Sequence, residues 1–423
     1  MNDAQTFKRI KKVLDFVWTS PYSSFYRDKY KKAGIDLAKD IKSIADFKKL
    51  PLLTREDIIN TDPHDRFFMP QEKIRWVHIS GGTTGGKVFG MFKATLAMPS
   101  TNFRVKKALD LKIKTAMIIL TETAFLAPLT RQSFRHKSIV RCLGSVYDLS
   151  RTAKIVKDLK VEALQTSPTV LELAIPHFKK ENITNLIRYI ILSGELCSNP
   201  RYKYFKKVFK NASFSFEFGC NEASLIGYSC PNIEEGSERN IFHPLDSNIF
   251  YETVTPEKEN YLVLTHLTTK TELPLIRYNT ADSASISKSN CKCGLGFKMK
   301  AFGRYGIQMI KVRDYMLYSE KLDNALSSVY KYLDSFNYKL LIFDYTKKQI
   351  LPKFNLQLVS KKNLRKDIKS LIKRQVIQQF FVSEDLSFND LVKKKIFLPL
   401  EVEFVDSFGL LIKHKPFVYH LDE

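Results

Sequence analysis

The sequence predicts an α/β fold in two domains: a large N-terminal domain of several subdomains and a small α+β C-terminal domain. Its 423 residues are too many for one ordinary hydrophobic core. From about residue 76 to 300, short apolar runs alternate with helical stretches, a pattern typical of a largely parallel sheet. Past about residue 305 the alternation changes to a compact mixture of both elements. We therefore expect domains at residues 1–304 and 305–423.

The first 75 residues or so are expected to be helical with loops. A Ser20-Pro21 pair punctuates the first amphipathic stretch, and Thr54 with Asp57 three residues later matches a helix N-cap. The predicted helices here are 8–18, 25–32, 45–49 and 54–60.

In the alternating region, apolar runs predict buried strands and the stretches between them predict helices. The expected strands are 116–120, 163–165 and 189–192, and the expected helices are 151–159, 168–175 and 200–209. Residues 261–266 and 284–287 are predicted to be β elements of a subdomain. In the C-terminal domain we expect helices at 322–332 and 361–380, and strands at 338–345, 354–359 and 400–405.

The net charge is strongly positive, because 68 Lys and Arg outnumber 44 Asp and Glu to give +24. Such a charge suits an anionic partner, but most of the excess is Lys scattered in pairs, without a dense block. We therefore do not expect nucleic-acid binding. No run of about 18 apolar residues predicts a membrane span. The N-terminal residues MNDAQTFKRIKK contain no apolar signal core, so we expect a cytoplasmic protein.

The most informative segment is residues 80–87, which read Ser-Gly-Gly-Thr-Thr-Gly-Gly-Lys. Glycines allow backbone N–H groups to converge on phosphate oxygens, and the hydroxyls and the Lys add donors and charge. The segment is not a Walker A loop, because Val88 rather than Ser or Thr follows Lys87. It predicts a phosphate-binding loop of another kind.

This loop resembles the nucleotide-phosphate loop of the adenylate-forming superfamily, and the chain is most similar to phenylacetate–CoA ligases and their capsule-biosynthesis homologues. Five later segments resemble motifs of that family, in the family's order. They are 164–168 (LQTSP), 192–195 (LSGE), 218–222 (FGCNE), 273–282 (LPLIRYNTAD) and 303–304 (GR). The resemblance covers about residues 20 to 420 and implies the adenylate-forming fold.

The resemblance also implies an ATP/AMP site with Mg²⁺. Glu222 would hold the metal against the phosphates, since a carboxylate is an expected Mg²⁺ ligand. Asp282 would accept hydrogen bonds from the ribose, and Arg304 would fix the ribose or the α-phosphate. The residues expected near the adenine are Gly194, Glu195, Phe218 and Gly219. Those expected at the phosphates are Ser80, Gly81, Gly82, Thr83, Thr84, Gly85 and Lys87, with Thr84 among the catalytic residues.

The C-terminal domain is expected to supply a catalytic lysine. Relatives end in a Gly-Lys-Ala-like segment whose Lys contacts the reacting carboxylate, and residues 411–415 of this chain read LIKHK in that place. We assign the role to Lys413, with Lys415 as the second candidate. Such a lysine would stabilise charge during adenylation and then leave as its domain rotates.

Four residues form a candidate metal site. Cys230 is followed thirteen positions later by His243, and Cys291 and Cys293 come further along the chain. Three Cys and one His make a closed set typical of structural Zn²⁺. The resemblance points the same way, because relatives carry a similar set.

The sequence thus predicts an ATP-dependent ligase that converts a small carboxylic acid into an acyl- or aryl-adenylate and transfers it to a thiol. The thiol is CoA or the phosphopantetheine arm of an acidic carrier protein, which the positive charge would attract. Residues 121–137 lack the family's Gly- and aromatic-rich stretch, so the sequence does not predict which carboxylic acid is the substrate. A homodimer is possible, but the sequence does not decide the oligomeric state. The alternatives are an amide-forming ligase, an adenylyltransferase, and a nucleic-acid-binding scaffold on a degenerate ligase fold.

Overall fold

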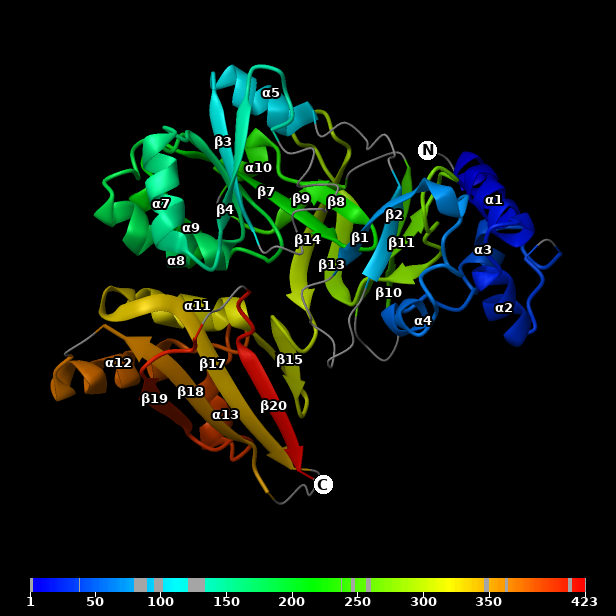
Figure 1. The fold of residues 1–423 in the computed structure, drawn as a ribbon. Helices are drawn as coiled ribbons and strands as arrows, with labels where there is room; N and C mark the ends of the chain where they lie inside the picture. Colours follow the sequence, from blue (N-terminus) through cyan, green and yellow to red (C-terminus); the bar gives the residue numbers. More distant parts are fainter. Residues whose placement is uncertain are drawn as a thin grey trace.

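The computed structural model gives the chain an elongated form with the N-terminal helices at one end and the C-terminal sheet at the other (Figure 1). The structure describes residues 3–37, 39–79, 90–94, 102–120, 134–236, 238–244, 248–255, 260–345, 350–361, 364–409 and 413–422. The predicted phosphate loop at 80–87 lies outside these residues.

The N-terminal segment consists of four helices, α1 (Asp3–Thr19), α2 (Phe25–Lys32), α3 (Ile44–Phe47) and α4 (Arg55–Ile59). In α1 the buried Ile10, Val13, Leu14 and Val17 follow the three-and-four spacing of one helix face. The predicted cap of α4 is confirmed, because Thr54 accepts from the Asp57 N–H and the Asp57 side chain accepts from the Thr54 N–H.

A nine-stranded sheet forms the centre of the molecule, in the order β13-β14-β9-β8-β7-β6-β5-β3-β4. Its parallel half contains β3 (Thr115–Leu120), β4 (Val140–Ser145), β5 (Ala163–Thr166), β6 (Tyr189–Leu192) and β7 (Ser213–Cys220). Its antiparallel half contains β8 (Ser224–Tyr228), β9 (Ile241–Pro244), β13 (Asp282–Lys288) and β14 (Phe297–Arg304). The sheet is therefore mixed, and its parallel half is the part that the apolar runs predicted.

Helices cover both faces of the parallel half. Met117 and Ile190 pack in the main core with α7 (Leu149–Asp158), α8 (Pro168–Lys180) and α9 (Asn199–Val208). Their neighbours Ala116 and Tyr189 point to the other face, toward α5 (Asn102–Asp110). Because successive strand residues point to opposite faces and both faces are covered, the inner strand β6, with the sequence YIIL, is buried at every residue.

Two smaller sheets accompany the central one within the described part of residues 1–304. β1 (Ile74–Ile79) pairs with β2 (Gly90–Ala94), and β10 (Ile249–Val254), β11 (Tyr261–His266) and β12 (Tyr278–Asn279) form a three-stranded sheet. The expectation that 261–266 and 284–287 share one β subdomain was wrong in detail, because the second segment belongs to β13 of the central sheet. A short helix, α10 (Pro231–Glu235), follows β8.

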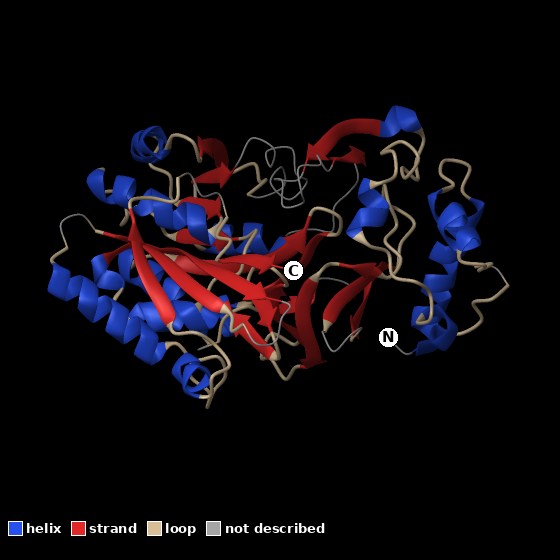
Figure 2. Ribbon diagram, turned by 90° about the horizontal axis from the view of Figure 1, so that it is seen from below, coloured by secondary structure: helices blue, strands red, loops and turns tan. Residues whose placement is uncertain are grey.

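Residues beyond β14 build a second hydrophobic core. They form β15 (Met309–Val312), β16 (Tyr315–Tyr318), α11 (Ser319–Ser327), β17 (Leu333–Tyr345), β18 (Lys353–Ser360), α12 (Lys366–Gln379), α13 (Phe388–Lys393), β19 (Leu400–Val405) and β20 (Phe417–Asp422). The strands β19-β18-β17-β20 make a four-stranded sheet packed on helices, which lies beside α8 and α9 (Figures 1 and 2). Tyr204 of α9 packs against both cores. Among the described helices, none has the length and hydropathy that a membrane crossing requires.

Candidate active site

Asp282 and Arg304 form a bidentate ion pair at the junction of the two cores. The guanidinium donates from Nε and Nη2 to the two carboxylate oxygens at 3.2 and 3.0 Å. The two residues sit opposite each other at the paired ends of β13 and β14. Attraction to Asp282 raises the pKa of Arg304, so the guanidinium stays charged. The sequence-predicted ribose residues are therefore neighbours.

Glu222 lies in the turn between β7 and β8, and Gly219 makes that turn tight. A Cβ at Gly219 would stand 2.3 Å from the backbone carbonyl oxygen of Ser224, so a larger residue does not fit there. Ser224 adopts a φ of 62°. The turn places the Glu222 side chain in the interior, with only 2% of it exposed.

The surroundings of Glu222 contain residues that the sequence analysis missed. The Arg55 Nη1 atom of α4 lies 3.6 Å from Glu222 Oε1, and Tyr278 hydrogen-bonds to the same carboxylate. Burial, reinforced by repulsion from Glu222, raises the pKa of the Tyr278 hydroxyl. Oε1 itself makes no direct hydrogen bond within the described part of the chain. The Glu222 carboxylate is therefore buried between Arg55 and Tyr278, with one oxygen that makes no direct hydrogen bond to a described residue.

Arg55 reaches Glu222 because the N-terminal segment is fastened to the strand that carries Tyr278. The N–H of Leu53 donates to the Arg277 carbonyl at 2.9 Å, and the N–H of Asn279 donates back to the Leu53 carbonyl at 2.9 Å. The hydroxyl of Tyr26 donates to the Pro274 carbonyl at 2.5 Å. The capping box and the LPLIRYN segment are both recognisable in the sequence, but neither indicates that the two segments contact each other in the fold.

Gly194 and Glu195 lie at the interface with the C-terminal domain. Gly194 has a φ of +89°, and a Cβ built on it would lie 3.9 Å from Cε of Lys413. One Glu195 oxygen accepts from the Thr169 N–H at 2.5 Å, and the other accepts from the His414 N–H at 3.0 Å. Glu195 therefore ties α8 to the segment that carries Lys413.

Lys413 is brought to the Asp282–Arg304 pair from about 110 residues further along the chain. Desolvation lowers the pKa of its ammonium group, although the side chain as a whole is exposed. The charges that act on it are Glu195, Arg304, Asp282 and Lys415, in that order. Lys415 is exposed. Of the two candidate lysines, Lys413 is thus the one at the junction.

The remaining predicted nucleotide-site residues are Phe218 and the phosphate loop. Phe218 is buried and stacks on Phe242, with ring centroids 5.4 Å apart. The phosphate-loop residues Ser80, Gly81, Gly82, Thr83, Thr84, Gly85 and Lys87 lie outside the described residues, between β1 and β2.

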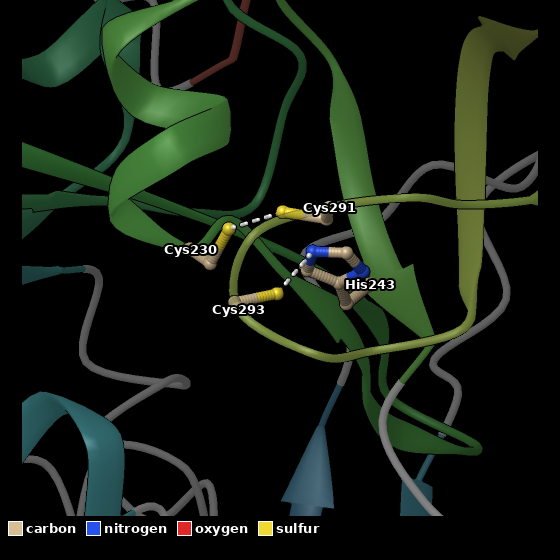
Figure 3. Close-up of side chains that lie close together, drawn as sticks. All are labelled: Cys230, His243, Cys291 and Cys293. Carbon is tan, nitrogen blue, oxygen red and sulfur yellow. Dashed lines mark hydrogen bonds between the residues drawn. The ribbon is translucent and has the colours of Figure 1, made fainter.

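The four predicted metal ligands converge (Figure 3). Their ligand atoms lie within 4.8 Å of one another, with Cys230 Sγ 3.5 Å from Cys291 Sγ and Cys293 Sγ 3.2 Å from His243 Nε2. The ring atom Nδ1 of His243 lies 2.7 Å from the Phe297 carbonyl oxygen, as in a donated hydrogen bond that leaves Nε2 to face the sulfurs. Cys230 precedes α10, His243 lies on β9, and the last two cysteines lie in the β13–β14 connection.

The solved structures with the same fold are adenylate-forming enzymes. The chain matches 2-hydroxyisobutyryl-CoA ligase in the postadenylation state with 2-HIB-AMP, with a TM-score of 0.75 and 16% identity, covering 99% of this chain and 89% of that one. Against the same ligase with 2-HIB-AMP and CoA in the thioesterification state, the TM-score is 0.56 at 16% identity, over 99% and 90% of the two chains. The chain thus superimposes more completely on the first of these two structures than on the second.

Curated proteins with a similar sequence include phenylacetate-coenzyme A ligases. The chain is 25% identical over 316 residues to the phenylacetate-coenzyme A ligase of Thermus thermophilus, covering 68% of this chain and just under two thirds, 66%, of that ligase. A stretch of 60 residues is 37% identical to the phenylacetate-coenzyme A ligase of Escherichia coli, over 14% of each chain. The chain is thus similar in sequence to phenylacetate-coenzyme A ligases over about two thirds of its length. No family model matches it.

Proposed function

We propose that this chain is an ATP-dependent ligase that activates a small carboxylic acid as an acyl-adenylate and transfers the acyl group to the thiol of CoA. The observation that carries the proposal is the meeting of Lys413, Gly194 and the Asp282–Arg304 pair across the domain interface. The sequence similarity to phenylacetate-coenzyme A ligases and the likeness to a ligase with a bound acyl-AMP support the same reaction.

The nucleotide would lie between the central sheet and Lys413. In this proposal the Asp282 carboxylate accepts hydrogen bonds from the ribose hydroxyls, and Arg304 holds that carboxylate in place through two hydrogen bonds. Glu222 would hold Mg²⁺, and its buried oxygen without a direct hydrogen bond fits such a hard cation. Bound Mg²⁺ would supply positive charge at the ATP phosphates. The loop at 80–87 would add backbone donors there.

The first half-reaction follows from these placements. A carboxylate oxygen of the acid attacks the α-phosphorus of ATP, the bond to the β-phosphate oxygen breaks, and pyrophosphate leaves. Negative charge on the approaching carboxylate and the α-phosphate develops in the region where Lys413 lies. A cation positioned there would stabilise that charge as it develops. No covalent enzyme intermediate is needed.

The second half-reaction transfers the acyl group from AMP to a thiol. The CoA sulfur attacks the acyl carbon, and AMP leaves with the pair of electrons of the broken mixed-anhydride bond. We infer that residues 305–423 form a domain that turns between the two half-reactions about the β14–β15 connection, removing Lys413 and admitting the thiol. The separate cores on either side of that connection support the division.

We infer that the Cys/His set holds structural Zn²⁺. The sulfurs of two thiolates on a tetrahedral Zn²⁺ stand about 3.8 Å apart, given Zn–S bonds near 2.3 Å. The spacing of 3.5 Å between Cys230 and Cys291 is close to this value. Such a centre would fasten the β13–β14 connection to β9 and α10. A carrier-protein thiol as the acceptor stays an alternative prediction. The homodimer and the cytoplasmic location also stay predictions.

The test is ATP–pyrophosphate exchange with magnesium across a panel of aryl, fatty and small hydroxy acids, beginning with phenylacetate. Exchange that depends on one class of acid, followed by AMP release and thioester formation on adding CoA, is the expected result. Exchange without thioester formation would contradict CoA as the acceptor. Absence of both exchange and ATP binding in folded protein would contradict the ligase proposal.

A further inference from the structure

The contact between the two domains contains a buried charged cluster that the catalytic proposal does not use. Arg201 of α9 lies among three acidic side chains, Glu172 of α8, Glu195 and Asp323 of α11. The Arg201 and Glu172 side chains are 3% and 2% exposed. Buried charge at the meeting surface of two domains is costly unless it is well paired, so its presence calls for an explanation.

Glu172 makes bonds to both domains. One carboxylate oxygen lies 3.1 Å from Arg201 Nε within the N-terminal domain. The other accepts from the Tyr330 hydroxyl at 3.0 Å and from the Phe336 N–H at 2.7 Å, both in the C-terminal domain. Arg201 also crosses the interface, because Nη2 donates to Asn337 Oδ1 at 3.1 Å. The pair therefore binds the C-terminal domain through three hydrogen bonds.

Aromatic side chains surround this pair. Tyr330 and Phe336 stack on each other with ring centroids 3.9 Å apart, and Tyr204 of α9 meets the Tyr330 ring at 4.6 Å. Figure 1 shows α11 and β17 next to α8 and α9. The cluster is thus shielded on the side of these rings.

A continuous set of contacts joins this cluster to Lys413. Asn337 is next to Tyr338, whose ring meets the His414 ring at 4.7 Å and whose carbonyl oxygen lies 3.0 Å from His414 Nε2. His414 follows Lys413 in the chain and donates its N–H to Glu195. The same small region of the interface thus holds the C-terminal domain against α8 and α9 and also holds the segment before β20, which carries Lys413.

We propose that the Glu172–Arg201 pair is a latch: its bonds to Tyr330, Phe336 and Asn337 hold the C-terminal domain in the arrangement that places Lys413 over the nucleotide. Glu172 and Arg201 are then positioning residues for the first half-reaction. The inference rests on the proposed function for its catalytic meaning, but the latch itself is a property of the interface.

Charge suits a latch that must open. An apolar contact of this size would leave an exposed apolar face whenever the domain turned, whereas ionised groups regain water when they separate. The desolvation cost of the buried pair offsets much of its attraction, so the closed state is held without being fixed permanently. The bonds from Tyr330 and Asn337 then decide how far the equilibrium favours closure.

The experiment removes these bonds without removing the buried charges. Tyr330→Phe and Asn337→Ala each delete one interdomain bond, and Tyr332→Phe, in the same short turn, is the matched control. Each hydrogen bond to a charged group typically contributes a factor of about ten or more to an equilibrium. Small-angle scattering of the full chain should show the double variant with a larger radius of gyration than wild type, and the control unchanged. An unchanged double variant that keeps its melting temperature would overturn the latch.

The half-reactions give the second readout. With an acid that supports exchange, the double variant should lose about tenfold or more in ATP–pyrophosphate exchange but keep its rate of thioester formation from a supplied acyl-adenylate within about threefold. Equal losses in both half-reactions would indicate general damage and contradict the proposal. If wild type exchanges with no acid, the proposed function fails, and the scattering result still decides the latch.

Discussion

The backbone N–H of His414 donates a 3.0 Å hydrogen bond to the carboxylate of Glu195, 219 residues earlier in the chain. The bond crosses the domain interface and uses the oxygen that Thr169 leaves available. Because it is made by the backbone, it constrains the path of the chain next to Lys413 whatever the His414 ring does. Glu195 was predicted to pack near the adenine, a role that stays a prediction, and its bond to His414 was not foreseen.

Lys413→Ala should slow ATP–pyrophosphate exchange by about a hundredfold or more, because a cation at the reacting groups is lost. Lys415→Ala is the matched control and should change the rate less than about threefold, since contact with the reacting groups is assigned to Lys413 and not to Lys415. Desolvation lowers the pKa of Lys413, so the wild-type rate should fall at a lower alkaline pH than for an ordinary lysine. Equal activity of both variants and wild type would contradict the assignment.

Glu222→Gln should lower exchange by about a hundredfold and raise the magnesium concentration needed for half-maximal rate, because an amide is a weaker Mg²⁺ ligand than a carboxylate. Glu238→Gln, at an exposed acid paired with Lys300 at 3.7 Å, serves as the control. Initial rates over a magnesium titration give both quantities. An unchanged magnesium dependence in the Glu222 variant would remove that residue from the metal site.

Purified protein should contain about one zinc per chain by elemental analysis. His243→Ala should lose the metal and lower the melting temperature, because the β13–β14 connection is then released from β9. Cys142→Ser alters a cysteine of β4, outside the metal set, and should keep the zinc. Metal-free wild type of undiminished stability would show that the four side chains do not form a zinc centre.

Asp323→Asn should stabilise the protein at neutral pH more than at acidic pH. Burial raises the pKa of Asp323 to about 6, against the attraction of Arg201. A carboxyl whose pKa is raised on folding contributes stability that is full below its unfolded pKa, near 4, and lost as the pH rises through about 6. The variant lacks this loss, so its gain should grow between pH 4 and pH 7 by up to about 3 kcal/mol.

The measurement for Asp323 is urea unfolding of both proteins at pH 4.5 and pH 7.5. The neighbouring Glu172, Glu195 and Arg201 are the same in both proteins, so their titration largely cancels in the difference. A variant that is destabilised equally at both pH values would show that the carboxylate acts through hydrogen bonds and not through its charge.

Gly219→Ala should destabilise the fold by about 1–3 kcal/mol, because the added methyl group meets the Ser224 carbonyl at 2.3 Å and neither strand can move freely. Gly296→Ala is the control, since a Cβ there meets nothing within 4 Å. Thermal unfolding compares the two. A tolerated Gly219 variant would mean that the β7–β8 turn can widen, and Glu222 would then move with it.

The sequence predicted the helices and strands that can be recognised from their own residue pattern. Runs buried on both faces were located to the residue, as for β6 and β11, and so was the amphipathic α2. The strands β7, β9 and β14 were not predicted, because their alternating polar and apolar residues do not by themselves indicate which strands they pair with. Helix α12 begins at Lys366 and not at 361.

The candidate site shows the same division. The motifs located Asp282, Arg304 and Glu222 in the sequence, and the fold brings the first two into contact. Arg55 could not be found in this way, because only the pairing of Leu53 with the strand at Tyr278 brings it to Glu222. The Glu172–Arg201 pair was missed because neither residue belongs to a motif. Both residues form hydrogen bonds to C-terminal residues that the sequence does not connect with them.

The fastening of the N-terminal helices to residues 274–279 has a consequence for synthesis. Leu53 and Arg277 are 224 positions apart, so at roughly 5–20 residues per second the helices wait about 10 to 45 s for the strand that covers them. During that time Tyr26 has its aromatic neighbours Tyr30 and Phe68, but it lacks the backbone of Pro274, to which its hydroxyl donates. Newly made chains therefore expose this surface of the N-terminal helices until residues 274–279 have left the ribosome, and a chaperone that binds nascent N-terminal segments would have most effect before then.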